Sequence, residues 1–242
     1  MIRLVERENV AQFEEYCKGD PYGVRIVAAE RTYGTSESFA QFWLQYNDKG
    51  EITAAIGRLD NGMTVCAKGD YDEEEIDAFV EMCVGKTGAL RPVRKGEVAD
   101  GVIMRLDRTR MTASGGETEL NPPIEDVYSV LERCPGMGFD VPPFEYFYDD
   151  MKKRIKQGTQ IVALLRADLF PAACAALHIA DGTGVVTMCA TLPEHRGKGF
   201  AADVVGALLE RYRDGDVYVM CLSSLVEFYK HLGFGPVGGF VY

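Results

Sequence analysis

Three short apolar runs, separated by turn-forming residues, mark the second half of the chain. They have the length and composition of strands, so we expect strands at 159–168, 171–181 and 184–192. After a glycine-rich turn, apolar residues recur at helical spacing at Ala201, Val204, Val205, Leu208 and Tyr212. The pattern therefore predicts three strands followed by an amphipathic helix.

The first half shows the same order. Residues 39–69 contain three apolar runs separated by the turn clusters 47–50 and 60–62, which predicts three strands. A helix is expected next, with Ile76, Phe79, Val80 and Cys83 on one face. The segments AAIGRLDNGMTVCAKG and AALHIADGTGVVTMCA are also similar letter by letter. We interpret the two halves as an internal duplication.

The rest of the chain predicts further elements of both kinds. They are a strand at 102–106, a loop or linker at 110–123, helices around 124–131 and 144–155, a strand at 216–222, a short helix at 224–234 and a strand at 235–242. This mixture predicts an α/β (α+β) fold. We expect a first domain over residues 1–100 and a second over residues 101–242.

The net charge and the apolar runs of the chain argue against two classes of partner, nucleic acids and membranes. The 242 residues carry a net charge of −11, which repels phosphates, so we expect no nucleic-acid partner. The acidity is compatible with a cationic substrate and equally with an ordinary soluble surface. No run of about 18 apolar residues occurs, and the first residues, MIRLVERENVAQFEEY, lack the pattern of a signal peptide. We therefore expect no membrane partner.

The cysteines and histidines favour no metal site. The seven cysteines form no CxxC pair, and the three histidines have no thiols near them in the sequence. Reduced, buried thiols are typical of a cytoplasmic protein, and we expect that location.

The stretch EHRGKGFAA, residues 194–202, precedes the helix of the second half. A helix usually begins with Ser, Thr, Asp or Asn, but this one begins with glycines between Arg196 and Lys198. Glycines allow close approach to the backbone, and the free N–H groups of a first helical turn attract anions. The stretch is therefore either a phosphate-binding turn or a plain turn.

Two motifs here resemble the GNAT superfamily of N-acetyltransferases. Arg196-x-x-Gly199-x-Ala201 is similar to its acetyl-CoA signature, Gln/Arg-x-x-Gly-x-Gly/Ala. The later EFYKHLGF, with Phe228, Tyr229, Gly233 and Phe234, resembles its Phe-Tyr-x-x-x-Gly-Phe motif. The resemblance covers roughly residues 100–242. It implies two tandem GNAT-like mixed sheets flanked by helices, of which the first is a degenerate copy.

The resemblance also implies a cofactor, acetyl-CoA, and the residues that hold it. The strand before the turn would part from its neighbour, and its free backbone would bind the pantetheine arm at Cys189, Ala190 and Thr191. The diphosphate would bind the helix start, where the ligand replaces the missing cap. The residues implied there are Arg196, Gly197, Lys198, Gly199, Phe200, Ala201 and Ala202.

Tyr229 matches the tyrosine that lies near the thioester sulfur in the family. The resemblance implies that its phenol protonates the departing thiolate. Because a phenol has a higher pKa than a thiol, hydrogen-bond stabilisation of the developing charge is the alternative. A third interpretation is an aromatic core residue without a catalytic role.

The general base is not evident. Glu145, Glu194 and His178 are candidates, and each also has an ordinary structural interpretation. Many relatives carry an asparagine seven residues before the tyrosine, but Leu222 stands there, followed by Ser223 and Ser224. A serine replaces that contact or the contact is absent.

Two segments of the first half do not point to a nucleotide. The stretch KGDYDEEEIDAF places acidic residues at a helix start, where they satisfy the helix dipole and repel a diphosphate. We therefore expect no CoA site in the first half. The sequence GKTG at 85–88 lacks the earlier glycine of a phosphate-binding loop, because Val80 stands there.

The hypothesis is an acetyl-CoA-dependent N-acetyltransferase in which an amine attacks the thioester directly in a ternary complex. The acceptor is a small-molecule or peptide amine, and the protein is a monomer or a homodimer. The alternative is a catalytically inactive acyl-CoA-binding sensor or scaffold, and nucleotide binding at the same turn is a third. Cys189 and Cys221 lie on expected strands, where we expect packing roles.

Overall fold

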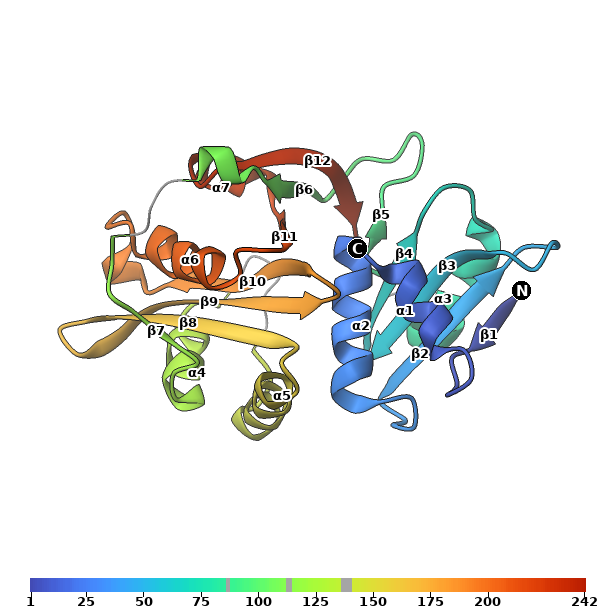
Figure 1. Ribbon diagram of the computed structural model, residues 1–242, viewed down its shortest axis with the longest axis horizontal. Coiled ribbons are helices and arrows are strands. Elements are labelled where there is room, and N and C mark those ends of the chain that lie inside the picture. Colours follow the sequence, from blue (N-terminus) through green and yellow to red (C-terminus); the bar gives the residue numbers. More distant parts are fainter. Residues whose placement is uncertain (86–87, 112–114, 136–140) are drawn as a thin grey trace.

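The computed structural model describes residues 1–85, 88–111, 115–135 and 141–242. Two β-sheets lie side by side, each with helices packed on its faces (Figure 1). The expectation of an α/β (α+β) fold with two sheets flanked by helices is confirmed. In the described part of the chain, every helix is too short or too polar to cross a membrane.

The first sheet has four antiparallel strands in the order β1-β2-β3-β4. Phe42 and Leu44 pack with α1 and α2 on one face, whereas Trp43 packs with α3 on the other, because successive strand residues face opposite ways. The strands and the helix expected in this half are confirmed, and the segment 1–38, without an expected element, forms β1, α1 and α2. The elements are β1 (Ile2–Leu4), α1 (Val10–Cys17), α2 (Pro21–Tyr33), β2 (Ala40–Tyr46), β3 (Ile52–Leu59), β4 (Gly62–Ala67) and α3 (Glu73–Val84).

The second sheet has eight strands in the order β5-β12-β6-β11-β10-β9-β8-β7. Every element expected in this half is present, with one correction. The expected loop at 110–123 contains a short strand, β7, which pairs with β8; residues 112–114 of that loop lie outside the described residues. The strands are β5 (Arg91–Pro92), β6 (Gly101–Leu106), β7 (Thr118–Leu120), β8 (Gln160–Ala167), β9 (Phe170–Ala180), β10 (Thr183–Thr191), β11 (Asp216–Cys221) and β12 (Phe234–Val241). The helices are α4 (Ile124–Glu132), α5 (Phe144–Gln157), α6 (Phe200–Arg211) and α7 (Val226–His231).

The two halves repeat one succession of elements. β1-α1-α2-β2-β3-β4-α3 in the first half corresponds to β7-α4-α5-β8-β9-β10-α6 in the second. The layers correspond as well. Val162 and Cys174 pack with α4 and α5 on one face of the second sheet, while Ala163 and Ala175 pack with α6 on the other. The second half continues with β11, α7 and β12, which build the site described below.

A short segment links the two sheets. Leu90 forms a parallel bridge with Thr64 of β4, and the next two residues, β5, pair with β12 of the second sheet. Strand β6 then inserts between β11 and β12. The boundary expected between residues 100 and 101 thus falls between two strands that both belong to the second sheet.

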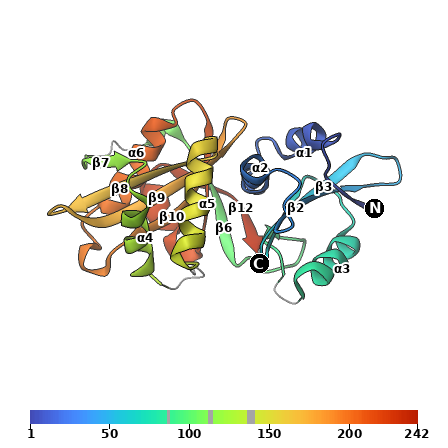
Figure 2. The same ribbon diagram turned by 90° about the horizontal axis from the view of Figure 1, so that it is seen from below.

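Helix α2 lies between the two sheets in both views (Figures 1 and 2). Its apolar side chains share one core with Ala180 and Val185 of the second sheet. Arg31 forms an ion pair with Asp181 at 2.7 Å, and the hydroxyl groups of Thr32 and Thr159 are 2.8 Å apart. α2 therefore belongs to the core of the first half and to the interface with the second.

Candidate functional site

Strands β10 and β11 part in the middle of the second sheet. They pair in parallel only over Thr183–Val186 and Asp216–Val219. The pairing of β10 with β9 shifts between Thr187 and Ala190, and Met188 has a left-handed φ of +52°. This bulge bends β10 away from β11, so the strands separate where the resemblance predicts.

The separated part of β10 presents free backbone. Leu192 N donates to Ala172 O at 2.9 Å, and in an antiparallel pair the peptide groups of alternate residues face opposite sides. Those of Cys189 and Thr191 therefore face the gap between β10 and β11. Part of this edge is already used, because Arg196 Nε donates to Thr191 O at 3.2 Å and Cys134 Sγ does so at 3.4 Å.

Helix α6 begins without a side-chain cap. Its N-cap residue is Gly199, with φ of +87°, and Gly197 has φ of +76°. Both glycines are exposed, and nothing lies within 4 Å of a Cβ placed on either. Among the described residues, the N–H groups of residues 197–201 have no acceptor. The uncapped start predicted from the sequence is therefore present and open to solvent.

Cationic side chains surround this helix start. Arg196 and Lys198 are exposed, and Lys198 Nζ lies 3.2 Å from His195 Nδ1. One carboxylate, which sequence reasoning missed, lies in the first turn. Asp203 accepts hydrogen bonds from the N–H groups of Gly115 and Gly116 at 3.2 and 3.1 Å, which ties the loop before β7 to α6. In the sequence, the adjacent glycines of that loop were the feature that could have indicated this contact.

Tyr229 is buried on α7 and packs edge-on against Phe228 and Phe234. Its hydroxyl faces the thiol of Cys189, on the separated part of β10. Burial and the neighbouring thiols Cys189 and Cys221 raise the pKa of Tyr229 well above its usual value. Burial likewise raises the pKa of Cys189 to about 11. The phenol is therefore neutral and lies at the gap between the strands.

Two of the three candidate bases are exposed. Glu145 lies in the first turn of α5. Glu194 Oε1 is 2.6 Å from Arg133 Nη2, and hydrogen bonds from its own backbone and from Arg133 lower the pKa of Glu194. A paired carboxylate with a lowered pKa is a poor general base near neutral pH.

His178 has free nitrogens but is distant from the gap. It pairs with Val185, before the strands part, and Cys189 lies four residues further along β10, or about 13 Å at ~3.3 Å per residue. Burial and the nearby arginines lower the pKa of His178 well below its usual value. At the asparagine position, Leu222 is half-buried, and both following serines are exposed.

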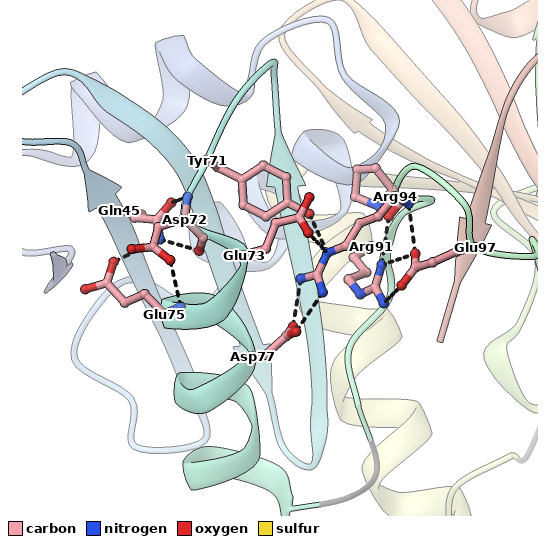
Figure 3. A network of polar contacts seen from close by, with 10 residues as sticks. Gln45, Tyr71, Asp72, Glu73, Glu75, Asp77, Arg91, Arg94 and Glu97 are labelled. Carbon is pink, nitrogen blue, oxygen red and sulfur yellow. Dashed lines mark hydrogen bonds and ion pairs between the residues drawn. The ribbon is translucent and has the colours of Figure 1, made fainter.

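The corresponding helix start in the first half is closed by its own side chains (Figure 3). Asp72 is the N-cap of α3 and accepts from Glu75 N at 2.9 Å. Gln45 Nε2 donates to Glu75 Oε2 at 2.9 Å, and Gln45 Oε1 accepts from Asp72 N at 3.1 Å. The predicted internal cap is confirmed, and the N–H groups of Asp72 and Glu75 are occupied by side chains.

One arginine from the segment after α3 contacts this helix start, and a second braces that segment. Arg94 forms two hydrogen bonds with Asp77, at 2.6 and 2.7 Å, and lies 3.4 Å from Glu73. Arg91 also donates two hydrogen bonds, of 2.7 Å each, to the carboxylate of Glu97. Because of this pairing, the pKa of Glu97 is lowered to about 2. In Figure 3 Arg94 reaches the acidic helix start from the segment that follows α3, whereas Arg91 pairs with Glu97 within that segment. Of the GKTG segment at 85–88, residues 86 and 87 lie outside the described residues.

Comparison with known proteins agrees with this geometry. Residues 124–234 match the model of the acetyltransferase (GNAT) family. A tandem GNAT protein from the clavulanic acid biosynthesis pathway is similar over 100% of this chain and 97% of its own, with 13% identity and a TM-score of 0.62. An acetyltransferase from the GNAT family of Colwellia psychrerythraea is similar over 99% of this chain and 97% of its own, with 12% identity and a TM-score of 0.59. No curated protein matches the chain. At these identities, the structural matches establish the fold: a tandem arrangement that spans the whole chain.

Proposed function

We propose that the protein, whose residues 124–234 form a domain of the acetyltransferase (GNAT) family, is an acetyl-CoA-dependent N-acetyltransferase. The observation that carries the proposal is the gap between β10 and β11. It lies between the uncapped start of α6 and the buried phenol of Tyr229. The first half supplies no second site, because α3 is capped by Asp72.

The residues at the gap fit acetyl-CoA. The free N–H groups of residues 197–201 suit a diphosphate, because helix N-termini bind such anions without further help. Arg196 and Lys198 add positive charge at that end. The peptide groups of Cys189 and Thr191 can pair with an amide-bearing arm in the manner of an added strand.

Bound acetyl-CoA would supply an acetyl thioester, from which an amine takes the acetyl group. The role of Tyr229 Oη is then to donate a hydrogen bond to a sulfur that gains negative charge. Its raised pKa makes complete proton transfer to a thiolate unfavourable, because a thiol ionises at a lower pH than this phenol. Hydrogen-bond stabilisation therefore describes Tyr229 better than general acid catalysis. The acceptor we propose is a small-molecule or peptide amine.

The alternative, an inactive acyl-CoA-binding sensor, is favoured by one observation. Glu194 is paired with Arg133, His178 is distant from the gap, and Leu222 offers no polar side chain there. An enzyme of this design depends on an amine that has already lost its proton, or on water as the proton acceptor. Activity would then rise with pH as the amine deprotonates.

The test is thiol release from acetyl-CoA with a panel of amines, together with calorimetric measurement of CoA binding. The Tyr229→Phe variant should lower kcat about 100- to 1000-fold, the effect of losing one preorganised donor, and leave the Kd for CoA unchanged. Tyr146→Phe is the matched control, because Tyr146 is an exposed tyrosine on α5. CoA binding without turnover of any amine would establish the sensor instead, and wild-type kcat in Tyr229→Phe would remove Tyr229 from the mechanism.

A further inference from the structure

A cavity of about 270 Å³ lies between the two halves of the molecule, away from the gap just described. One wall is formed by α2 and strands β2 to β4 of the first half, and the other by α5 and β9 of the second. Figure 2 shows α2 beside α5 at this interface. The apolar part of the wall includes Ile26, Phe42 and Leu59. The polar part holds three arginines, Arg25, Arg58 and Arg154, together with His178, Asn61, Thr64 and Tyr242.

Arg25 has no ion-pair partner among the residues that the structure describes. Its Nε is buried without a hydrogen-bond partner, and no carboxylate of the described residues forms an ion pair with it. Burial lowers the pKa of Arg25, while Tyr242 opposes that shift and Arg154 adds to it. An arginine sits on this face of α2 even though an apolar residue would pack there without the cost of an unpaired charge.

The second half contributes further unpaired donors. Arg154 is 3% exposed, and Asp150 binds its Nε at 2.7 Å, but its Nη1 is buried without a partner. Both ring nitrogens of His178 are likewise buried and unpartnered, and in the neutral ring that its lowered pKa favours one of them is an N–H donor. Arg58 differs, because its Nε donates to Asp60 O and its Nη1 to Gln41 Oε1. The unused donors therefore come from α2, α5 and β9 and line one cavity.

Buried polar groups are almost always satisfied in folded proteins, and an unpaired buried charge is strongly unfavourable. A small oxyanion in the cavity would satisfy Arg25, Arg154 and His178 together. We propose that this cavity binds a small multivalent oxyanion, a phosphate or a dicarboxylate, that joins the two halves. The volume is near the lower end for metabolite pockets, and the apolar wall leaves room for a short carbon skeleton.

The site is separate from the acetyl-CoA site. None of the residues that line the cavity belongs to the turn at 196–202 or to the gap at 189–191. The proposal does not depend on the acetyltransferase activity, so each can fail without the other. Ligand binding at this interface would couple the position of α2 to the second sheet.

The test measures Tm by fluorimetry with added inorganic phosphate or malonate, against chloride at equal ionic strength. Phosphate or malonate should raise Tm of the wild-type protein by about 5–10 °C at a hundred times its Kd. Arg25→Gln should abolish the shift, and should itself be about as stable as wild type without ligand, since the half-buried guanidinium that it removes has an Nε without a partner. Arg7→Gln, an exposed arginine, is the control for net charge.

Lys198→Gln distinguishes this cavity from the α6 helix start. A shift that survives Lys198→Gln and disappears in Arg25→Gln supports the proposal, and the larger response of the two ligands identifies the anion class. A shift that survives Arg25→Gln, or equal shifts in all variants, overturns it. If Arg25→Gln does not fold, Arg25→Met and calorimetric titration with the same two anions replace it, with the same outcomes. No response of the wild-type protein to either anion also overturns the proposal.

Discussion

Helices α3 and α6 occupy corresponding places in the two halves, and they begin in opposite ways. At α3 the N-cap residue is Asp72, and carboxylates fill the first turn. At α6 the N-cap residue is Gly199, no side chain caps the helix, and Lys198 and Arg196 precede it. Both helices follow a third strand and pack on the same face of their sheets. The same backbone arrangement thus supports either a self-sufficient helix start or one that offers its amides to an anion.

The difference also extends to the surroundings of each helix start. Arg94 pairs with Asp77 and Glu73 at the start of α3, so part of the acidic charge there is balanced within the chain. At α6, no acid of the described residues forms an ion pair with Arg196 or Lys198, and Asp203 instead holds the loop at 115–116. The first half therefore contributes a self-capped helix start and the interface helix α2, while the uncapped helix start lies in the second half.

The largest effect is expected when the acidic cap of α3 is transferred to the start of α6. Gly199→Asp should raise the Kd for CoA about 100-fold, because losing hydrogen bonds to a charged group costs about 2–3 kcal/mol. Gly199→Asn is the matched control, since Asn has nearly the same shape, no charge and the same tolerance of positive φ. Calorimetry of CoA binding compares the two. Equal affinities in the two variants would show that charge at this helix start does not matter.

A smaller effect is expected where the cap of α3 is removed. Asp72→Ala should lower the free energy of unfolding by about 1 kcal/mol, the usual contribution of a side-chain cap. Glu74→Ala, which removes an exposed carboxylate from the same turn, should have little effect. Urea denaturation followed by circular dichroism measures both. Neither variant should change the Kd for CoA, and a loss of CoA affinity in Asp72→Ala would place ligand binding in the first half.

The smallest effect concerns pH. Arg91 and the N–H of Arg94 lower the pKa of Glu97 to about 2 in the folded protein, against about 4.3 when unfolded. The pairing therefore stabilises the fold fully above about pH 5, and this contribution disappears as pH falls from about 4.3 toward 2. Solvent screening limits such a surface pair to about 0.2–1 kcal/mol.

Denaturation of wild type and Glu97→Gln at several pH values tests this assignment. The difference in unfolding free energy should be constant near neutral pH and vanish near pH 2. Glu74→Gln provides the baseline for removing an unrelated carboxylate. A difference that grows as the pH falls would contradict the assignment of the lowered pKa to Glu97.

Much of the fold was predictable because its elements are locally encoded. The strands at 159–192 and the helices after them have clear apolar periods. Gly197 and Gly199 predicted the helix start without a side-chain cap. The strand at 118–120 was missed, because three residues in a polar loop carry no period and pair only through β8. The cavity at Arg25 and Arg154 was also missed, since these arginines lie 129 positions apart and look like ordinary surface residues in the sequence.

The sequence by itself determined the order of the elements, the repeat, and the contrast between an acidic and a glycine-rich helix start, because each depends on residues close together in the chain. Tertiary structure decided which groups meet. Tyr229 reaches Cys189 only because α7 folds over the place where β10 bends away from β11. Burial then sets their pKa values and leaves the donors between the halves unpaired. Such effects depend on solvent exclusion by distant segments, which no local pattern encodes.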